Sequence, residues 1–273
     1  MLKHKVLYTG ASTAVRAFET HEGDDELSNL VNMGKLFKEF TNYEVIDCSE
    51  FGKPNQWLMD NNILNSGYDT DVPIYWLWSD PLMCAYWGEG RKFPDIPEKN
   101  HAICYRMITE DWEEAYYEFA DLDLKYINSI GYKIFLVGSS GDILPWQVEK
   151  YENLTVVHDS WVKTIALKKD IYYKYPYVNV TLYHQLINYF FPLKINKWQE
   201  LYKNDREDLR DHPHINSDFV DLIYSTYKIT KDMEEKGYWL GVHPNIKGNV
   251  LYHNTIKHKL KEHIDNHYRE TYA

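Results

Sequence analysis

Cysteine and long apolar runs are both scarce in this sequence. The three cysteines, Cys48, Cys84 and Cys104, lack CxxC spacing and lie within or beside apolar segments, where a thiol behaves as a small hydrophobic group. Their odd number and spacing argue against a disulfide framework and favour a reducing compartment. No stretch approaches the roughly 18 apolar residues of a membrane span, and the apolar run in the N-terminal MLKHKVLYTGAS is too short for a signal peptide. We therefore expect a cytoplasmic protein without a membrane partner.

Positive charge is in deficit as well. The chain has 41 acidic and 30 basic residues, a formal net charge of −11, so its long-range field repels nucleic acid. It also lacks the HExxH, paired CxxC, GxGxxG and Walker lysine patterns that hold metals and nucleotide cofactors. Residues 138–142 (GSSGD) superficially resemble a phosphate-binding turn, but without those companions we interpret them as a plain strand-to-helix loop. We expect no nucleic-acid partner, no metal and no cofactor.

What the sequence does contain is an alternation of short apolar runs and helical patterns. The runs typical of strands are Lys5–Thr9, Tyr43–Cys48, Val72–Trp78, Tyr132–Val137 and Leu154–Val157. Helical spacing starts at Ser12, recurs from Leu27 to Phe37, and fills Asp111–Ile130 before the stop signal Gly131. The acidic residues from Thr109 to Asp123 are interpreted as a solvated helix face, and His101–Ile108 fits either a strand or the start of a helix. The alternation predicts a three-layer α/β/α fold around a central, mostly parallel five-stranded sheet.

The later part of the chain departs from this alternation. Residues from about 168 to 215 are rich in tyrosine, and we interpret them as a helical insertion or cap. A helix over Ser217–Glu235, a glycine-bounded segment from Gly237, and a last helix to about His267 follow. No repeat or linker divides the chain, so we expect one domain over residues 1–273.

Ser12 and His243 are the candidate catalytic residues. In an open parallel sheet the ligand site lies beyond the carboxyl ends of the strands, and Ser12 follows the first strand at the start of a helix. Unpaired N–H groups at such a position can activate a nucleophile and bind an oxyanion, although serine is also a common helix cap. His243 lies in a Pro/Gly-bounded loop (HPNIKGN) before the last helix, and the pKa of histidine suits a general base.

These segments together resemble the SGNH (GDSL-like) hydrolases, in style the divergent phage and marine bacterial members. KVLYTGAST resembles the first block of the family, EVIDCSEFGKPNQWL the second, VPIYWLWSD the third and GVHPNIKGNVLYHNTI the last. The resemblance covers nearly the whole chain and implies a flavodoxin-like α/β/α fold. It also implies Ser12 as nucleophile, His243 as base, and an oxyanion site formed by Gly52, Asn55 and Ser79.

The sequence departs from the family pattern at three positions. Ala11 replaces the usual acidic residue before the nucleophile, and Ser79 stands where an asparagine normally donates to the oxyanion. The carboxylate that orients the histidine is normally three residues before it, and here that residue is Leu240. Another acid can orient His243, with Asp80 and Asp142 as candidates by position; otherwise a backbone carbonyl orients it, or the site is a dyad or inactive.

The leading functional hypothesis is therefore a serine esterase that acts on a small acyl or acetyl ester, with a carbohydrate as a candidate alcohol. Trp57, Trp76, Trp78, Trp87 and Trp239 are candidates to stack on sugar rings, although a large core would bury such residues anyway. The alternative is a binding or assembly module that kept the fold and lost catalysis, which the residues Leu240 and Ser79 favour. A transferase that uses the same cleft has only the weak turn at residues 138–142 in its support.

Overall fold

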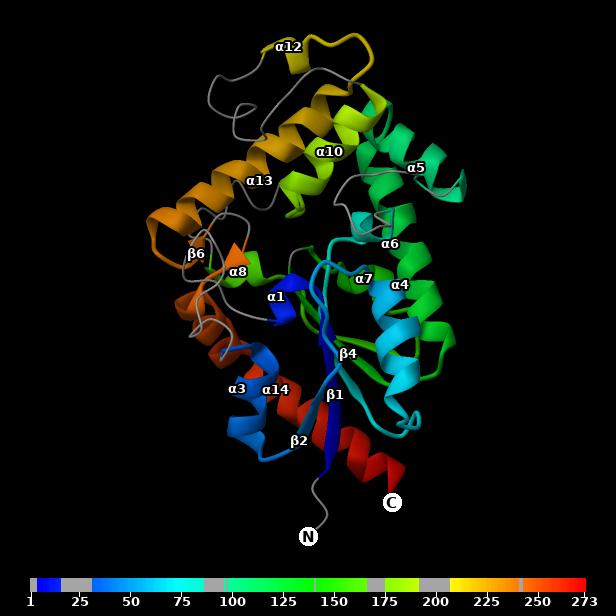
Figure 1. Ribbon diagram of the computed structural model, residues 1–273, viewed down its shortest axis with the longest axis vertical. Coiled ribbons are helices and arrows are strands. Elements are labelled where there is room, and N and C mark those ends of the chain that lie inside the picture. The colour runs from blue at the N-terminus through cyan, green and yellow to red at the C-terminus, as the bar shows by residue number, and fades with distance from the viewer. Residues whose placement is uncertain are drawn as a thin grey trace.

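Five parallel strands form the central sheet of the computed structural model, which describes residues 4–15, 31–85, 96, 98–139, 141–165, 175–191, 207–240 and 243–273. The strands are β1 (Lys5–Gly10), β2 (Glu44–Asp47), β3 (Ile74–Trp78), β4 (Ile134–Gly138) and β5 (Leu154–His158). Their order is β2-β1-β3-β4-β5, and every neighbouring pair is parallel. Helices cover both faces, as Figure 1 shows, so the predicted three-layer α/β/α fold is confirmed.

The helices and shorter elements follow the strands in the expected alternation. They are α1 (Ser12–Val15), α3 (Met33–Thr41), α4 (Asn55–Leu58), the π-helical turn η1 (Met59–Ile63), the 3-10 turns η2 (Leu64–Ser66) and η3 (Pro81–Ala85), α5 (Glu98–Thr109), α6 (Trp112–Ser129), α7 (Pro145–Val148), α8 (Trp161–Ile165), α10 (Val180–Phe190), α12 (Glu207–Arg210), α13 (Ser217–Glu235) and α14 (Ile246–Thr271). A short antiparallel hairpin, β6 (Trp239–Leu240) and β7 (His243–Pro244), precedes α14. His101–Ile108 belongs to α5, which settles that segment as a helix.

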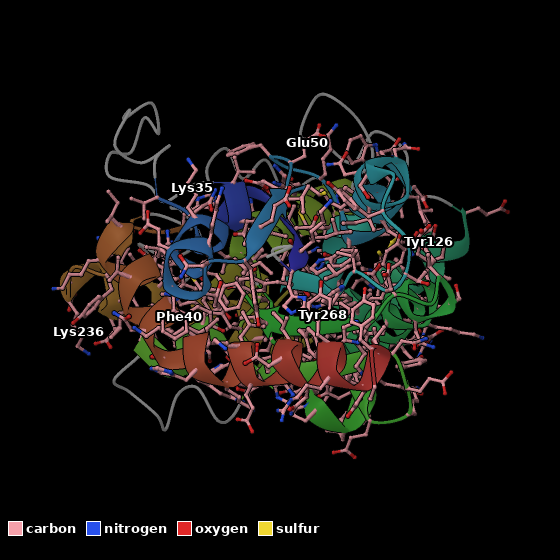
Figure 2. All side chains as sticks on the ribbon, turned by 90° about the horizontal axis from the view of Figure 1, so that it is seen from below. Lys35, Phe40, Glu50, Tyr126, Lys236 and Tyr268 are labelled. Carbon is pink, nitrogen blue, oxygen red and sulfur yellow. The ribbon has the colours of Figure 1, made fainter. Side chains whose placement is uncertain are left out.

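Alternate residues of the central strands enter different cores. Along β3, Tyr75 and Leu77 pack with α3, α8 and α14, whereas Trp76 and Trp78 pack with α4, η1 and the second half of α6. All five residues of β3 and of β4 are buried, as expected for strands covered on both faces. Helices α3 and α14 lie beside each other, as Figure 2 shows, and both contribute to the same core.

A third core lies beyond the carboxyl ends of the strands. It is built from α5, the first half of α6, α10 and much of α13, which form the upper part of the molecule in Figure 1. The predicted insertion at about 168–215 contributes α10 and α12 to it, and the rest of that segment lies outside the described residues except for 175–179, 191 and 211–215. The helical cap is thus larger than the tyrosine-rich segment alone.

Helix α14 spans the height of the sheet. The Tyr252 hydroxyl near its start donates to the Gly138 carbonyl at the carboxyl end of β4, at 2.9 Å. The Tyr268 hydroxyl near its end donates to the Lys5 carbonyl at the start of β1. The start of α14 therefore lies at the carboxyl ends of the strands. The segment directly before it, which carries His243, lies on the same side of the sheet. Among the described helices, none combines the length and apolar character needed to cross a membrane.

Candidate active site

The exit of β1 forces a sharp turn into the helix that begins at Ser12. Gly10 has φ 153°, and a Cβ there would lie 2.7 Å from the Leu77 carbonyl oxygen and 2.6 Å from the Ala14 Cβ. Only glycine fits that conformation and that space. Gly10 pairs with Leu77 in the sheet, so Ser12 and Ser79, each two residues further on, leave neighbouring strands at the same edge. The side chain of Ser12 lies outside the described residues.

The exit of β2 lies on the other side of Ser12. The Glu50 N–H donates to the Gly10 carbonyl at 3.2 Å, which holds the two exits together. The chain then turns at Gly52, whose φ of 71° lies in the left-handed region. Within the described residues the Gly52 N–H has no hydrogen-bond partner. The exits of β1, β2 and β3 thus bring the backbones of Ser12, Gly52 and Ser79 to one edge of the sheet.

The Asn55 side chain is buried, and both ends of its amide form hydrogen bonds within the protein. Its Nδ2 donates to the Asp123 carboxylate at 2.8 Å and to the Ser79 carbonyl at 3.3 Å. Its Oδ1 accepts from the Trp76 indole N–H at 3.2 Å and from the Ser79 N–H at 3.4 Å. Both Ser79 and Asn55 are buried, and the Ser79 hydroxyl has no hydrogen-bond partner among the described residues.

The sequence did not predict that Asp123 is buried beside Asn55. The acidic pattern of its helix predicts a solvated face, and for Asp123 that prediction is wrong, since the residue is fully buried. Burial raises the pKa of Asp123 to about 7, against the opposite effect of hydrogen bonds from Asn55 and Gln56. A period of 3.6 residues places Asp123 beside the buried Leu124 and Ile127, which is the sequence signal that could have separated it from its exposed neighbours.

Asp80 and Asp142 anchor the segment that leads into α10. The Asp80 carboxylate accepts from the Asn179 N–H at 2.7 Å and from the Leu82 N–H at 2.9 Å. The Asp142 carboxylate accepts from the Tyr177 N–H at 3.0 Å. Burial raises the pKa of Asp80 to about 7, while the two N–H groups lower it and the nearby Asp142 raises it. These contacts attach the helical cap to the exits of β3 and β4, and the orientation of His243 by either acid stays a prediction.

His243 lies in the hairpin that precedes α14. It pairs with Leu240, so the residue at the position of the missing acid is its cross-strand neighbour. The Asn245 side chain caps α14 by accepting from the Gly248 N–H at 2.9 Å and donates to the Gly237 carbonyl at 3.0 Å. In Figure 1, α1 and β6 both lie beyond the carboxyl ends of the strands. The catalytic roles of Ser12 and His243 stay predictions.

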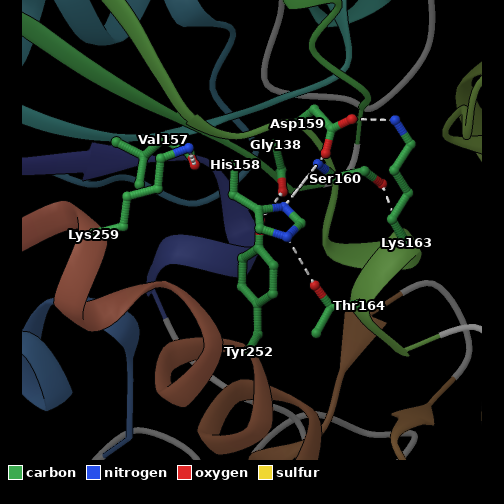
Figure 3. Close-up of polar contacts among 9 residues, drawn as sticks. All are labelled: Gly138, Val157, His158, Asp159, Ser160, Lys163, Thr164, Tyr252 and Lys259. Atoms are coloured by element: carbon green, nitrogen blue, oxygen red, sulfur yellow. Dashed lines mark hydrogen bonds and ion pairs between the residues drawn. The ribbon is translucent and has the colours of Figure 1, made fainter.

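A histidine that the sequence reading missed ends β5. The His158 Nδ1 accepts from the Ser160 N–H at 3.2 Å, and its Nε2 lies 3.2 Å from the Thr164 hydroxyl, as Figure 3 shows. Its ring packs edge-on against Tyr252 at 5.3 Å. Burial lowers the pKa of His158, and its Nδ1 accepts from the Ser160 N–H, which favours the neutral tautomer with the proton on Nε2. Its position directly after the apolar run LTVV was the available signal. These contacts tie the end of β5 to α8 and α14.

The tryptophans named for sugar stacking are mostly inaccessible. Trp76, Trp78 and Trp239 are buried in the core, so a stacking role for them is wrong. Trp57 is half-buried beneath the Lys53 ammonium, 4.4 Å from the ring centre, and Trp87 lies outside the described residues. Trp146, at the start of α7, is instead 58% exposed and packs edge-on against Tyr117.

A hollow at the opposite edge of the sheet lacks a serine or cysteine among its described lining residues. It has a volume of about 620 Å³, and its mostly polar lining includes Lys133, His263 and the apolar Phe135. The described residues also contain no group of three His, Cys, Asp or Glu side chains placed to hold a metal. We therefore place the candidate active site at the carboxyl edge.

Comparisons with known proteins give only remote likenesses. No family model matches the sequence, and no curated protein matches it. Among solved structures, the Bacillus subtilis protein YxiM has a TM-score of 0.38 at 10% identity, over 96% of this chain and 57% of that one. A carbohydrate esterase, described as having divergent catalytic and non-catalytic binding functions at its active site, has a TM-score of 0.36 at 10% identity, over 96% and 66%. The chain spans less than two thirds of either structure, and similarity at this level establishes neither family nor activity.

Proposed function

We propose that this protein is a serine hydrolase of small acyl esters, with Ser12 as nucleophile and His243 as general base. The observation that carries the proposal is the meeting of Ser12, Gly52 and Ser79 at three neighbouring strand exits. Parallel α/β sheets bind ligands at this edge, and the neighbouring backbone N–H groups there suit an oxyanion.

In the proposed reaction the Ser12 hydroxyl oxygen attacks the ester carbonyl while His243 takes its proton. The N–H groups of Ser12 and Gly52, with the Ser79 hydroxyl, donate to the oxyanion that forms. The tetrahedral intermediate expels the alcohol, which receives the proton from His243, and leaves an acyl group on Ser12. Water, deprotonated by His243, then attacks the acyl-enzyme and releases the carboxylic acid. An acetylated carbohydrate is a candidate substrate within this class.

A catalytically degenerate binding module is the second candidate. The departure at position 240 favours it, because a leucine stands where the family pattern has a carboxylate. The internal use of both ends of the Asn55 amide favours it as well, since neither end is left to bind a substrate.

Covalent labelling separates the two candidates. The full chain is treated with a fluorophosphonate probe, and intact mass is compared for wild type, Ser12→Ala and His243→Ala. Ser66→Ala, at the opposite edge of the sheet, is the matched control, and circular dichroism checks that each variant is folded. The hydrolase is supported if wild type and Ser66→Ala each carry a single adduct and if Ser12→Ala and His243→Ala carry none. Folded wild-type protein without an adduct overturns it and leaves the binding module.

A further inference from the structure

Asp123 is a fully buried carboxyl group at the far end of a chain of hydrogen bonds that reaches the exit of β3. It lies on α6, and its Oδ2 accepts from the Asn55 Nδ2 at 2.8 Å. Asn55 in turn contacts both the N–H and the carbonyl of Ser79. Asp123 thus lies two hydrogen-bonded steps from the residue that the proposed function places at the oxyanion.

The network fixes which way the Asn55 amide points. Its Oδ1 faces two N–H donors, those of Trp76 and Ser79, so a reversed amide would place its own donors against them. Its Nδ2 then faces the Asp123 carboxylate, which is an acceptor without a competing donor of its own when it is ionised. Asp123 therefore stabilises the orientation of Asn55 that Trp76 and Ser79 also require.

The contacts with Asn55 leave one polar atom of Ser79 without a hydrogen-bond partner among the described residues. Its N–H and carbonyl are engaged by Asn55, whereas its buried hydroxyl has no partner among the described residues. A buried hydroxyl that is left unpaired is costly, so in the proposed reaction this hydroxyl is an available donor for the ester oxygen. The fixed Ser79 peptide determines where that hydroxyl can point, because the side chain of serine has a single rotatable bond to its oxygen.

We propose that Asp123 is a positioning residue, which orients Asn55 and through it holds Ser79 in place to donate to the oxyanion. The inference rests on the proposed hydrolase function. It also assigns Asn55 a supporting role rather than direct contact with the substrate. A purely structural Asp123 would stabilise the fold without affecting turnover beyond the loss of folded protein.

The test compares two replacements of Asp123 with a packing control on the same helix. Asp123→Asn keeps a carbonyl oxygen that can accept from Asn55, whereas Asp123→Leu has similar bulk and no acceptor. Leu124→Ala removes buried apolar volume from α6 without touching Asn55. For each full-length variant, kcat and KM are measured with p-nitrophenyl acetate, thermal unfolding by circular dichroism, and Ser12 labelling by fluorophosphonate.

We expect Asp123→Leu to lower kcat roughly 10- to 100-fold with little change in KM, since misplacing one oxyanion donor has effects of that order. Asp123→Asn should retain kcat within about threefold, and Leu124→Ala should lower the unfolding temperature while kcat is preserved. The inference is overturned if Asp123→Leu and wild type have equal kcat values, or if Asp123→Leu and Leu124→Ala lose kcat equally. In either case, labelling of Ser12 would still support the proposed hydrolase function. Absence of labelling and turnover in folded wild type overturns both proposals.

Discussion

Leu240 pairs with His243 across the β6–β7 hairpin. Directly opposite residues of an antiparallel pair have Cβ atoms about 5 Å apart, on the same face of the ladder. A carboxylate at position 240 would therefore lie within reach of the imidazole, where the leucine offers no acceptor.

From this pairing we expect Leu240→Asp to raise kcat/KM for an activated acetyl ester roughly tenfold, because the new carboxylate stabilises the protonated form of His243 that arises when it takes the Ser12 proton. Leu240→Asn is the matched control, which can accept a hydrogen bond but adds no charge. Steady-state kinetics with p-nitrophenyl acetate checks the result. An unchanged rate in a folded Leu240→Asp protein would mean that another group already orients His243 or that the histidine is not the base.

Gly10 and Gly52 provide a second prediction, because both have positive φ but only one is crowded. A Cβ at Gly10 would lie within 3 Å of Ala14 and Leu77, whereas nothing lies within 4 Å of a Cβ at Gly52. We expect Gly10→Ala to lower the free energy of unfolding by roughly 2–4 kcal/mol, and Gly52→Ala by about 1 kcal/mol. Urea denaturation measures both. Equal losses in the two variants would contradict the close approach of Gly10 to β3.

The sequence predicts the sheet well because the central strands carry a strong signal. IYWLW and IFLVG are apolar on both faces, which is typical of short strands covered by helices on both sides. The edge strand β2 is less apolar and only partly buried, and its predicted limits extended beyond the observed Glu44–Asp47. The turn at Ser12 was also readable, since a glycine marks it. The segment HPNIKGN, predicted as a loop, instead forms strand β7, the Asn245 cap and the first turn of α14.

The hydrogen-bond partners at the site could not be read in the same way. Asp80, Asp123 and Asn55 owe their roles to contacts between residues 24 to 99 positions apart, which no local pattern encodes. The acidic composition of α6 hid the burial of Asp123, because charge counts do not identify which face of a helix a residue occupies. The abundance of tryptophan was misleading for a related reason, since large aromatic residues fill cores as readily as they line grooves.

Asp80 gives a third prediction, which concerns the attachment of the helical cap. Asp80→Ala removes the acceptor for the N–H groups of Asn179 and Leu82. Each donor left without a partner costs about 1–3 kcal/mol, so α10 should open more often than the sheet. We expect amide hydrogen exchange in α10 to accelerate roughly tenfold or more, as measured by mass spectrometry, with little change in β4.

The control for this experiment is Asp159→Ala. Asp159 also follows a strand, but its side chain is partly exposed and contacts Lys163 and His158 at the surface. It should leave exchange in α10 unchanged. Equal acceleration in α10 and β4 after Asp80→Ala would instead indicate global destabilisation and no specific role for Asp80 at the cap.

The buried carboxyl groups also predict how stability depends on pH. The pKa of Asp80 and that of Asp123 rise from an ordinary value of 3.8 to about 7 in the folded protein. A raised folded-state pKa favours folding fully below pH 3.8, and this contribution is lost as pH rises through 7. Between pH 5 and pH 8 these two groups should therefore reduce the free energy of unfolding by an amount on the order of a few kcal/mol.

Asp123→Asn isolates one of the two contributions, because the amide resembles the protonated acid and cannot ionise. Its free energy of unfolding, from urea titrations at several pH values, should fall less steeply above pH 5 than that of wild type, so the variant gains relative stability at pH 8. Asp121→Asn, on the same helix but partly exposed and paired with Lys150, should retain the wild-type slope. If the slopes of Asp123→Asn and wild type coincide, the Asp123 carboxyl group does not titrate in this range. It would then be ionised in the folded protein at pH 5 and held by the Asn55 hydrogen bond.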